Sequence, residues 1–223
     1  MWIYYTNEKH SRLKHKFKGS EDITINHSQS GQDIFTLMML DGKRNGTYLE
    51  IGAHDPINIS NTYLLEKSFD WTGLSIDIQE NPNFKFVRKN HYLIADALNI
   101  DYNEVLERYS LPSNIDYLSI DIEPSINTFT ALKNLPHDKY KFNVITFEHD
   151  FYSGDPYNVR IESREFLQSL GYKLVVTNLS GLGTNYPFED WYVNPDVVDP
   201  QIIDKFLDTS EPTKFFEDVI LSK

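Results

Sequence analysis

The chain contains no cysteine, which excludes disulfide bonds, thiolate metal sites and a cysteine nucleophile. It also lacks any apolar run near the roughly 18 residues that a membrane-spanning helix needs. Basic residues are few, because 21 Lys and Arg stand against 33 Asp and Glu for a net charge of −12. A phosphate backbone would repel such a chain, so a nucleic-acid partner is not expected. Residues 1–9 lack the order of a secretory signal, and the expected location is the cytoplasm.

Glycine is scarce at the turn where a nucleotide cofactor would bind. Segment 47–53 is apolar and contains Glu50 and Gly52, and segment 73–78 carries Asp77. A strand, a glycine turn, a helix and a strand ending in an acid are typical of a doubly wound α/β fold that binds the adenosine half of a cofactor. One glycine does not complete a dinucleotide loop, and a carboxylate at Glu50 repels phosphates but favours a cation. The pattern therefore predicts S-adenosylmethionine, a sulfonium.

The remaining chain predicts an α/β domain over residues 28–223, preceded by an N-terminal extension over 1–27. Seven strands are predicted, at 47–53, 73–78, 91–96, 115–121, 142–148, 172–178 and 189–193. Apolar residues recur at helical spacing in 125–135 and 158–170. Alternating strands and helices predict a mostly parallel sheet with helices on both faces. The last two strands are expected to pair antiparallel at one edge, which is the usual methyltransferase arrangement.

Acidic side chains lie at the ends of five consecutive predicted strands. They are Glu50, Asp77, Asp96, Asp121 and Glu148. The carboxyl ends of parallel strands share one edge of a sheet, where ligands bind, so we expect these acids to line one cleft. Each alone is more often a helix cap or a solvated strand end. Gathered together, they repel one another unless protons, a sulfonium or a metal ion offset their charge.

Several short motifs follow one another in a fixed order between residues 28 and 193. They are Ser28-Gln29-x-Gly31-Gln32-Asp33, Leu49–Ala53, Ser60-Asn61-Thr62-x-x-Leu65-Glu66, Trp71-x-Gly73-x-x-Ile76-Asp77, Ile115–Leu118 with Asp121 and Glu123, Glu148-His149, and Phe188–Trp191. Together they resemble the FkbM-type S-adenosylmethionine-dependent methyltransferases. The resemblance implies the Rossmann-like class I methyltransferase fold and methyl transfer to a hydroxyl oxygen, commonly on a sugar or a glycosylated natural product.

The strand-end pattern and the resemblance together suggest where the cofactor binds. We expect Asp77 to accept hydrogen bonds from the ribose, Asp96 to meet the adenine amino group, and the segment that contains Gln29 to cover the methionine end. The full cofactor set is Gln29, Glu50, Gly52, Asn61, Asp77, Asp96, Ala97 and Asp121. The chain departs from the family at Pro124, where a glycine is usual, which puts any backbone contact made there in doubt.

Methyl transfer to a hydroxyl needs a base or a metal, because an aliphatic hydroxyl is a poor nucleophile at neutral pH. We expect His149 to be the base, since it follows a strand and lies between Glu148 and Asp150, with His54 as the alternative. The expected catalytic group is His149, Asp121 and Glu148. Carboxylates Asp121, Glu148 and Asp150 also have the oxygen chemistry that a divalent cation such as magnesium prefers. If no metal binds, the sulfonium and hydrogen bonds must compensate these acids.

Two other functions stay open. One is a catalytically inactive methyltransferase-like binding protein; the other is a nicotinamide-dependent sugar-modifying enzyme, which the missing glycine triad and the missing Tyr-x-x-x-Lys pair disfavour. The expected partner is a small-molecule or carbohydrate acceptor. Segment Lys9–Lys18 carries five Lys and Arg and no acid, and is either a solvated arm that leans on Leu13 and Phe17 or a contact for an anionic substrate. The sequence does not identify the acceptor or the oligomeric state.

Overall fold

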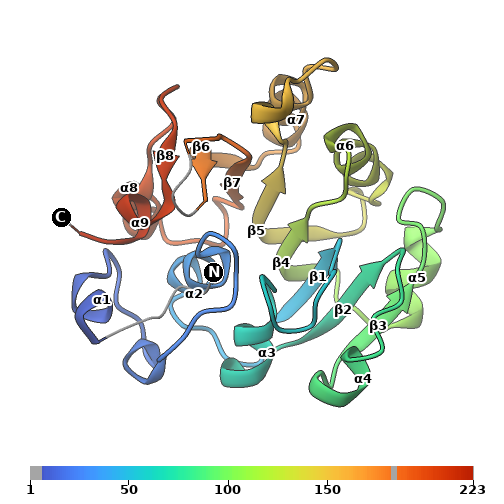
Figure 1. The fold of residues 1–223 in the computed structure, drawn as a ribbon, viewed down its shortest axis with the longest axis horizontal. Helices are drawn as coiled ribbons and strands as arrows, with labels where there is room; N and C mark the ends of the chain where they lie inside the picture. Colours follow the sequence, from blue (N-terminus) through green and yellow to red (C-terminus); the bar gives the residue numbers. More distant parts are fainter. Residues whose placement is uncertain (1–6, 182–184, 223) are drawn as a thin grey trace.

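A computed structural model describes residues 7–181 and 185–222 of the chain. Its centre is a sheet with the strand order β3-β2-β1-β4-β5-β7-β6-β8 (Figure 1). Strands β1 to β5 pair in parallel, whereas β7 lies antiparallel between β5 and β6. The strands are β1 Thr47–Ile51, β2 Thr72–Asp77, β3 His91–Ile94, β4 Asn114–Ile120, β5 Lys141–Glu148, β6 Lys173–Ser180, β7 Glu189–Val193 and β8 Lys214–Phe215.

This is the Rossmann-like methyltransferase fold that the sequence predicts, with one additional strand. All seven predicted strands are present, and β7 occupies the predicted range 189–193. The predicted count of seven is wrong by one, because β8 pairs in parallel with β6 at the edge of the sheet. With only two residues, β8 is too short to show a strand pattern in the sequence. The predicted antiparallel pair β6–β7 is confirmed, but β8 covers its outer side.

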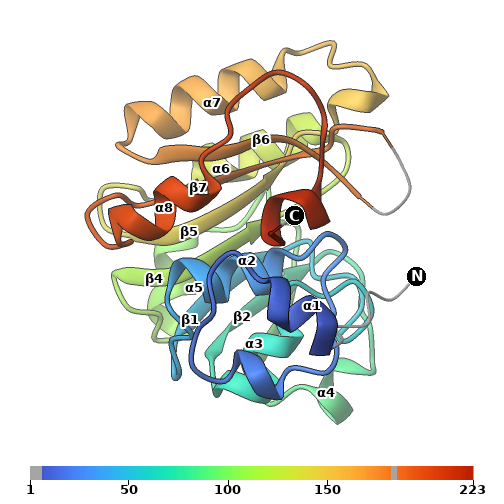
Figure 2. The same cartoon turned by 90° about the vertical axis from the view of Figure 1, so that its left-hand side faces the viewer.

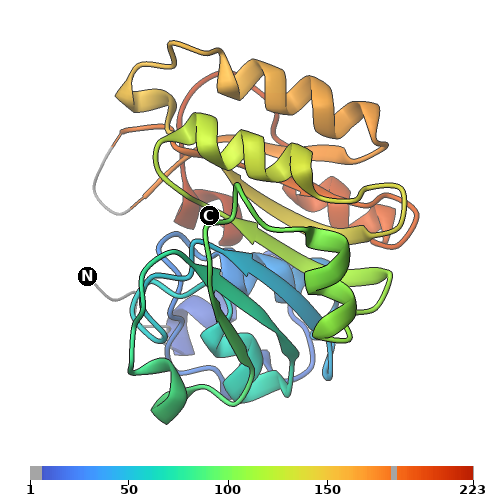
Figure 3. The same ribbon diagram turned by 90° about the vertical axis from the view of Figure 1, so that its right-hand side faces the viewer.

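Helices cover both faces of the sheet, as its alternating burial requires. Tyr48 and Tyr117 point into one core cluster, and their neighbours Leu49 and Leu118 point into the other. Figure 2 shows α2, α3 and α8 in front of the sheet, and Figure 3 shows α5, α6 and α7 (green to orange) on the opposite face. The helices are α1 Asn7–Arg12, α2 Gln32–Met39, α3 Tyr63–Phe69, α4 Phe84–Val87, α5 Tyr102–Arg108, α6 Ser125–Asn134, α7 Val159–Ser169, α8 Pro200–Phe206 and α9 Phe216–Ile220. In residues 7–181 and 185–222, no helix combines the length and the apolar character needed to cross a membrane.

The described part of the N-terminal extension packs against the domain. Leu13 and Phe17 are buried in the same core cluster as α2, α8 and α9. The backbone amide of Lys14 donates to the carbonyl of Ile220, 3.1 Å away, so the segment around Lys14 lies beside the end of α9. Residues 1–6 of the predicted extension lie outside the described residues, and the boundary at residue 27 stays a prediction. The segment Lys9–Lys18 thus leans on its two apolar side chains.

A buried arginine holds the connection between β1 and α3 in place. The Nε of Arg88 donates to Glu66 at 2.7 Å, and its two terminal nitrogens reach the carbonyl of Pro56 at 3.2 Å and the hydroxyls of Thr62 and Tyr48 at 2.8 and 2.9 Å. The Arg88 side chain is only 2% exposed. One cation therefore binds a helix, a strand and a loop together directly beneath the edge of the sheet where a ligand would bind.

Candidate functional site

A cavity of about 530 Å³ opens at the carboxyl ends of strands β1 to β5. This is the edge at which ligands bind in open α/β sheets, and the volume suits a small-molecule site. The described residues that line the cavity are Gln29, Gly52, His54, Ile59, Ile76, Asp77, Ile78, Gln79, Ala95, Asp96, Ala97, Leu98, Asp121, Ile122, Glu123, Asn127, Glu148 and Tyr152. The cavity is thus rich in carboxylates, and none of its described lining residues is Lys or Arg.

The predicted site residues fall into two groups. Those that line the cavity are Gln29, Gly52, Asp77, Asp96, Ala97, Asp121 and Glu148. Those that lie outside its lining are Glu50, Asn61, His149 and Asp150. The first group comes from strand ends and from the segment before α2, and the second group is turned into the protein around the cavity.

Two half-buried carboxylates on the β2 and β3 side anchor the turns that follow their strands. Asp77 accepts hydrogen bonds from the backbone amides of His54 at 2.7 Å and Gln79 at 2.8 Å. Asp96 accepts from the amide of Leu98 at 2.9 Å. A carboxylate offers about four acceptor positions, so both side chains retain free lone pairs for a ligand. They therefore shape the cavity wall and can bind what enters.

Gly52 lets the turn after β1 lie against the end of β4. Its φ is +91°, and a Cβ built on it would lie only 1.6 Å from the carbonyl oxygen of Asp121. The turn is fixed by the amide of Gly52, which donates to the carbonyl of Ile76 at 2.9 Å. The sequence pattern predicts this glycine for close approach to a ligand. In the structure its first requirement is close approach to a neighbouring strand.

Glu50 is a buried acid beneath the cavity and is not part of its wall. It accepts hydrogen bonds from the hydroxyls of Thr62 at 2.8 Å and Ser75 at 2.7 Å. Burial raises the pKa of Glu50, and the positive charge of Arg88 partly opposes that rise. Asn61 similarly donates to Ser119 at 2.9 Å. Both residues, which we expected to contact the cofactor, instead support the loop that forms the wall.

Three of the predicted acids meet where β4 and β5 end. Glu148 interacts electrostatically with both Asp121 and Asp150. Burial and the neighbouring carboxylates raise the pKa of Glu148 well above its usual range, and burial raises the pKa of Asp121 to about 6. At neutral pH, Asp121 is therefore mostly ionised, and Glu148 binds its proton more tightly than an isolated glutamate does. Below them, burial raises the pKa of Glu189 to about 8.

The structure offers no cation site at this cluster. Across the described ranges, no group of three or more His, Asp and Glu side chains is arranged to hold a metal ion. Asp150 is buried and does not line the cavity. The magnesium ligands predicted at Asp121, Glu148 and Asp150 stay a prediction, and no catalytic step is derived from a metal.

His149 points away from the cavity, contrary to the expectation that it is the base. Its ring is fully buried, with Nε2 3.3 Å from Oδ1 of Asp190 and Nδ1 accepting from the amide of Phe151 at 3.2 Å. Asp190 also accepts from Arg164 of α7 at 2.6 Å. His149 follows the last residue of β5, and its contact with Asp190, the partner of Arg164, places it on the side of α7. His54 does line the cavity and is exposed.

The segment before α2 forms one wall of the cavity. Asp33 is buried and accepts from the amide of His27 at 2.9 Å and from that of Ile34 at 2.8 Å. Its carboxylate also accepts from the hydroxyl of Ser28, and this closes the turn. Gln29 lines the cavity from the loop before α2. Of Gln29 and Asp33, the two side chains of this motif that could contact a ligand, Gln29 lines the cavity and Asp33 is buried.

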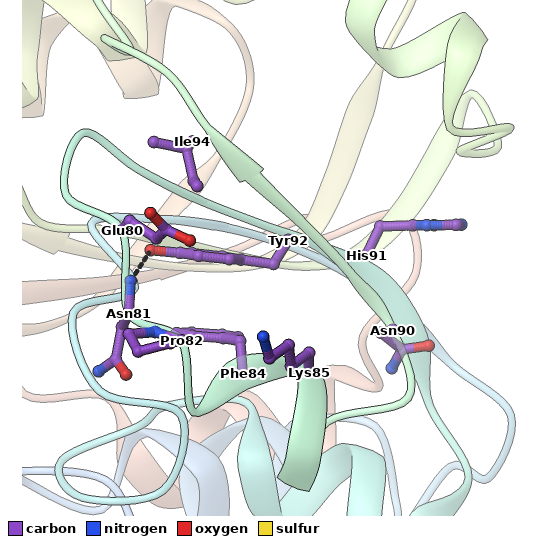
Figure 4. Close-up of a pocket in the computed structure, with 9 residues that line it drawn as sticks. All are labelled: Glu80, Asn81, Pro82, Phe84, Lys85, Asn90, His91, Tyr92 and Ile94. Carbon is purple, nitrogen blue, oxygen red and sulfur yellow. Dashed lines mark hydrogen bonds between the residues drawn. The ribbon is translucent and has the colours of Figure 1, made fainter.

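A second, smaller cavity of about 290 Å³ lies beside α4 and β3 (Figure 4). The rings of Phe84 and Tyr92 stack there with centroids 3.8 Å apart and planes 3° from parallel. The hydroxyl of Tyr92 accepts from the amide of Asn81 at 3.3 Å and donates to the carbonyl of Gln79. The stack therefore supports the turn that follows Asp77, on the adjoining side of the main cavity.

Comparison with known proteins shows likeness in structure only. No protein-family model and no curated protein matches the chain. A precorrin-6y C5,15-methyltransferase from Geobacter metallireducens GS-15 has 16% identity over 72% of this chain and 85% of its own, with a TM-score of 0.40. The MycE methyltransferase of the mycinamycin pathway, in complex with Mg and SAH, has 12% identity over 75% and 51%, with a TM-score of 0.46. Fibrillarin from Aeropyrum pernix, with natively bound S-adenosyl-L-methionine, has 12% identity over 68% and 67%, with a TM-score of 0.41.

Proposed function

We propose that the chain is an S-adenosylmethionine-dependent O-methyltransferase of the FkbM type that acts on a hydroxyl of a sugar or another small hydroxylated acceptor. One observation carries this proposal. Acids from β2 to β5 line a single cavity of small-molecule size, and none of the described lining residues is Lys or Arg. Such a cavity favours a positively charged occupant.

The lining residues fit each part of this cofactor. Asp77 has free lone pairs for the ribose hydroxyls, and Asp96 for the adenine amino group. Ile78 and Leu98 supply apolar surface for the adenine ring, and Gln29 is positioned for the methionine end. The acids also disfavour the nicotinamide-dependent alternative, because the pyrophosphate of NAD would lie among carboxylates without a compensating cation.

The residues at the ends of β4 and β5 can activate an acceptor. When bound, S-adenosylmethionine supplies an electrophilic methyl group on a sulfonium. Asp121, which is mostly ionised at neutral pH, accepts the proton that the acceptor hydroxyl must lose. Protonated Glu148 donates a hydrogen bond to Asp121 and holds that carboxylate in position. Alignment of the two reactants contributes much of the rate.

Replacing Asp77 with alanine is expected to weaken the binding of S-adenosylhomocysteine. The loss of a charge-assisted hydrogen bond costs about 1.5–3 kcal/mol, or roughly a 10- to 150-fold higher Kd. Titration calorimetry measures the change. Glu80→Ala is the matched control, because Glu80 is an exposed acid on the same turn that does not line the main cavity. An Asp77→Ala protein that binds as tightly as the Glu80→Ala protein contradicts the assignment of the ribose contact.

The proposed reaction is tested by incubating the protein with methyl-labelled S-adenosylmethionine and a panel of neutral sugars, glycosides and glycolipids. We expect label in at least one acceptor, attached through oxygen. Asp121→Asn is the matched blank, since it keeps the shape of the side chain but accepts no proton. Cofactor binding without label in any product would instead support a methyltransferase-like binding protein.

A further inference from the structure

Two exposed tyrosines form a stacked aromatic pair beside the cavity. Tyr152 is 49% exposed and Tyr186 is 60% exposed. Their rings are stacked, with centroids 5.6 Å apart and planes 29° from parallel, so each ring covers part of one face of the other and leaves its outer face exposed. Only Tyr152 lines the cavity, and we call this stacked pair the tyrosine shelf. Large aromatic side chains left in solvent next to a binding cavity are typical of surfaces that contact a ligand or a partner.

Backbone hydrogen bonds fix the position of the tyrosine shelf relative to the acids at the ends of β4 and β5. The amide of Tyr152 donates to the carbonyl of Pro187 at 3.2 Å. The amides of His149 and Asp150 both donate to the carbonyl of Phe188, at 2.7 and 3.0 Å. The turn after β5 and the segment before β7 therefore move as one piece. A ring placed on the shelf would keep a fixed distance from the end of β5.

Tyr152 joins the shelf to the reactive end of the cavity. It lines the cavity together with Asp121 and Glu148. Burial and the nearby charge of Asp150 raise the pKa of Tyr152 to about 12, so its hydroxyl is neutral at physiological pH. A neutral phenol donates a hydrogen bond, and the face of the ring that does not pack against Tyr186 stays available for stacking. Tyr152 thus lies beside the acids at the ends of β4 and β5 and is also exposed to solvent.

The charge around the shelf selects among acceptors. The charges of Asp150 and Glu123 raise the pKa of Tyr152, which places negative charge close to the phenol. Arg160 of α7 is already engaged, because it lies over the ring of Phe151 at 3.6 Å and donates to Asn178 at 2.8 Å. A phosphate or carboxylate on the acceptor would meet acids with no free cation in the described lining.

We infer that the tyrosine shelf is the acceptor subsite and that it takes an uncharged, hydroxylated acceptor with a flat ring face. The ring stacks on the exposed side of the tyrosine shelf, and one hydroxyl reaches Asp121. Phosphorylated, nucleotide-linked and uronic acceptors are rejected by the surrounding acids. This inference rests on the proposed methyl transfer and adds the class of acceptor. It also rules out an anionic substrate for the segment Lys9–Lys18, none of which lines the cavity.

Two aryl glycosides that differ by one charge test this subsite. We would titrate 4-nitrophenyl glucoside and 4-nitrophenyl glucuronide against the protein saturated with S-adenosylhomocysteine, and follow binding by saturation-transfer NMR. The glucoside is expected to bind more tightly than the glucuronide. Tyr186→Ala and Tyr152→Ala are each expected to weaken glucoside binding roughly 3- to 10-fold through the loss of one stacking face. Tyr152→Phe keeps the ring and should stay within about twofold.

The control is Tyr157→Ala, because Tyr157 is 63% exposed on the same surface but does not line the cavity. It should leave glucoside binding unchanged. Failure of the glucoside to bind, tighter binding of the glucuronide, or equal effects of Tyr157→Ala and Tyr186→Ala would overturn the inference. The proposed function is judged separately by S-adenosylhomocysteine binding in the same samples. If the cofactor product itself does not bind, the proposed function fails before the subsite is considered.

Discussion

Asp121→Asn is expected to lower kcat for methyl transfer by about 10²- to 10⁴-fold, the usual contribution of a general base. Asparagine fills the same space but accepts no proton. Binding of S-adenosylhomocysteine should change little, because the ribose and adenine contacts come from β2 and β3. Initial rates with labelled cofactor, combined with calorimetry of the product, separate the two effects. The matched control is Glu123→Gln, an exposed acid that lines the same cavity and should keep most of the activity.

The same base gives a pH dependence with a definite sign. Burial raises the pKa of Asp121 to about 6, so the carboxyl is protonated and inactive at lower pH and ionised at higher pH. The wild-type rate should therefore increase as the pH passes through about 6. This increase should disappear in Asp121→Asn. A variant that retains the wild-type rate and pH profile would assign the base to another group, with His54 the first to examine.

Arg88→Met is expected to destabilise the fold by about 3–5 kcal/mol, the cost of removing one partner from a buried ion pair. Methionine fills much of the volume but leaves Glu66 without its cation and the carbonyl of Pro56 without that donor. Urea unfolding followed by circular dichroism measures the loss. Arg44→Met is the matched control, since Arg44 pairs with Asp70 at 3.4 Å on the surface, where both side chains are more than half exposed.

The control should change the free energy of unfolding by no more than about 1 kcal/mol. If Arg88→Met costs no more than Arg44→Met, then hydroxyls and water replace the buried cation, and Arg88 does not hold the loop between β1 and α3.

The arrangement of the sheet could be predicted because its strands are apolar runs that end at polar residues. The strand-end rule then brought Asp77, Asp96, Asp121 and Glu148 to one cavity, which the structure shows. Their shared position depends only on parallel strand direction, and this is visible in the alternation of strands and helices.

The remaining site depends on side-chain direction and on partners far apart in the sequence. The sequence predicts His149 as the base from its place beside two acids, but its side chain lies against Asp190, 41 positions along the chain, which no local pattern reveals. Glu50 was predicted to contact the cofactor, but Thr62 and Ser75 hold it inside. The sequence does not predict Tyr152 as a site residue. Its stacking partner Tyr186 is distant in the sequence, and no local pattern marks the pair.

The most direct test of the proposed function is a calorimetric comparison of S-adenosylhomocysteine and NAD binding to the unmodified protein. We predict that S-adenosylhomocysteine binds at one site and that Asp77→Ala weakens it, whereas NAD gives no saturable heat. Tight NAD binding with no S-adenosylhomocysteine binding would contradict the proposal. A cavity lined by ionised carboxylates should repel the pyrophosphate of NAD and favour a cation.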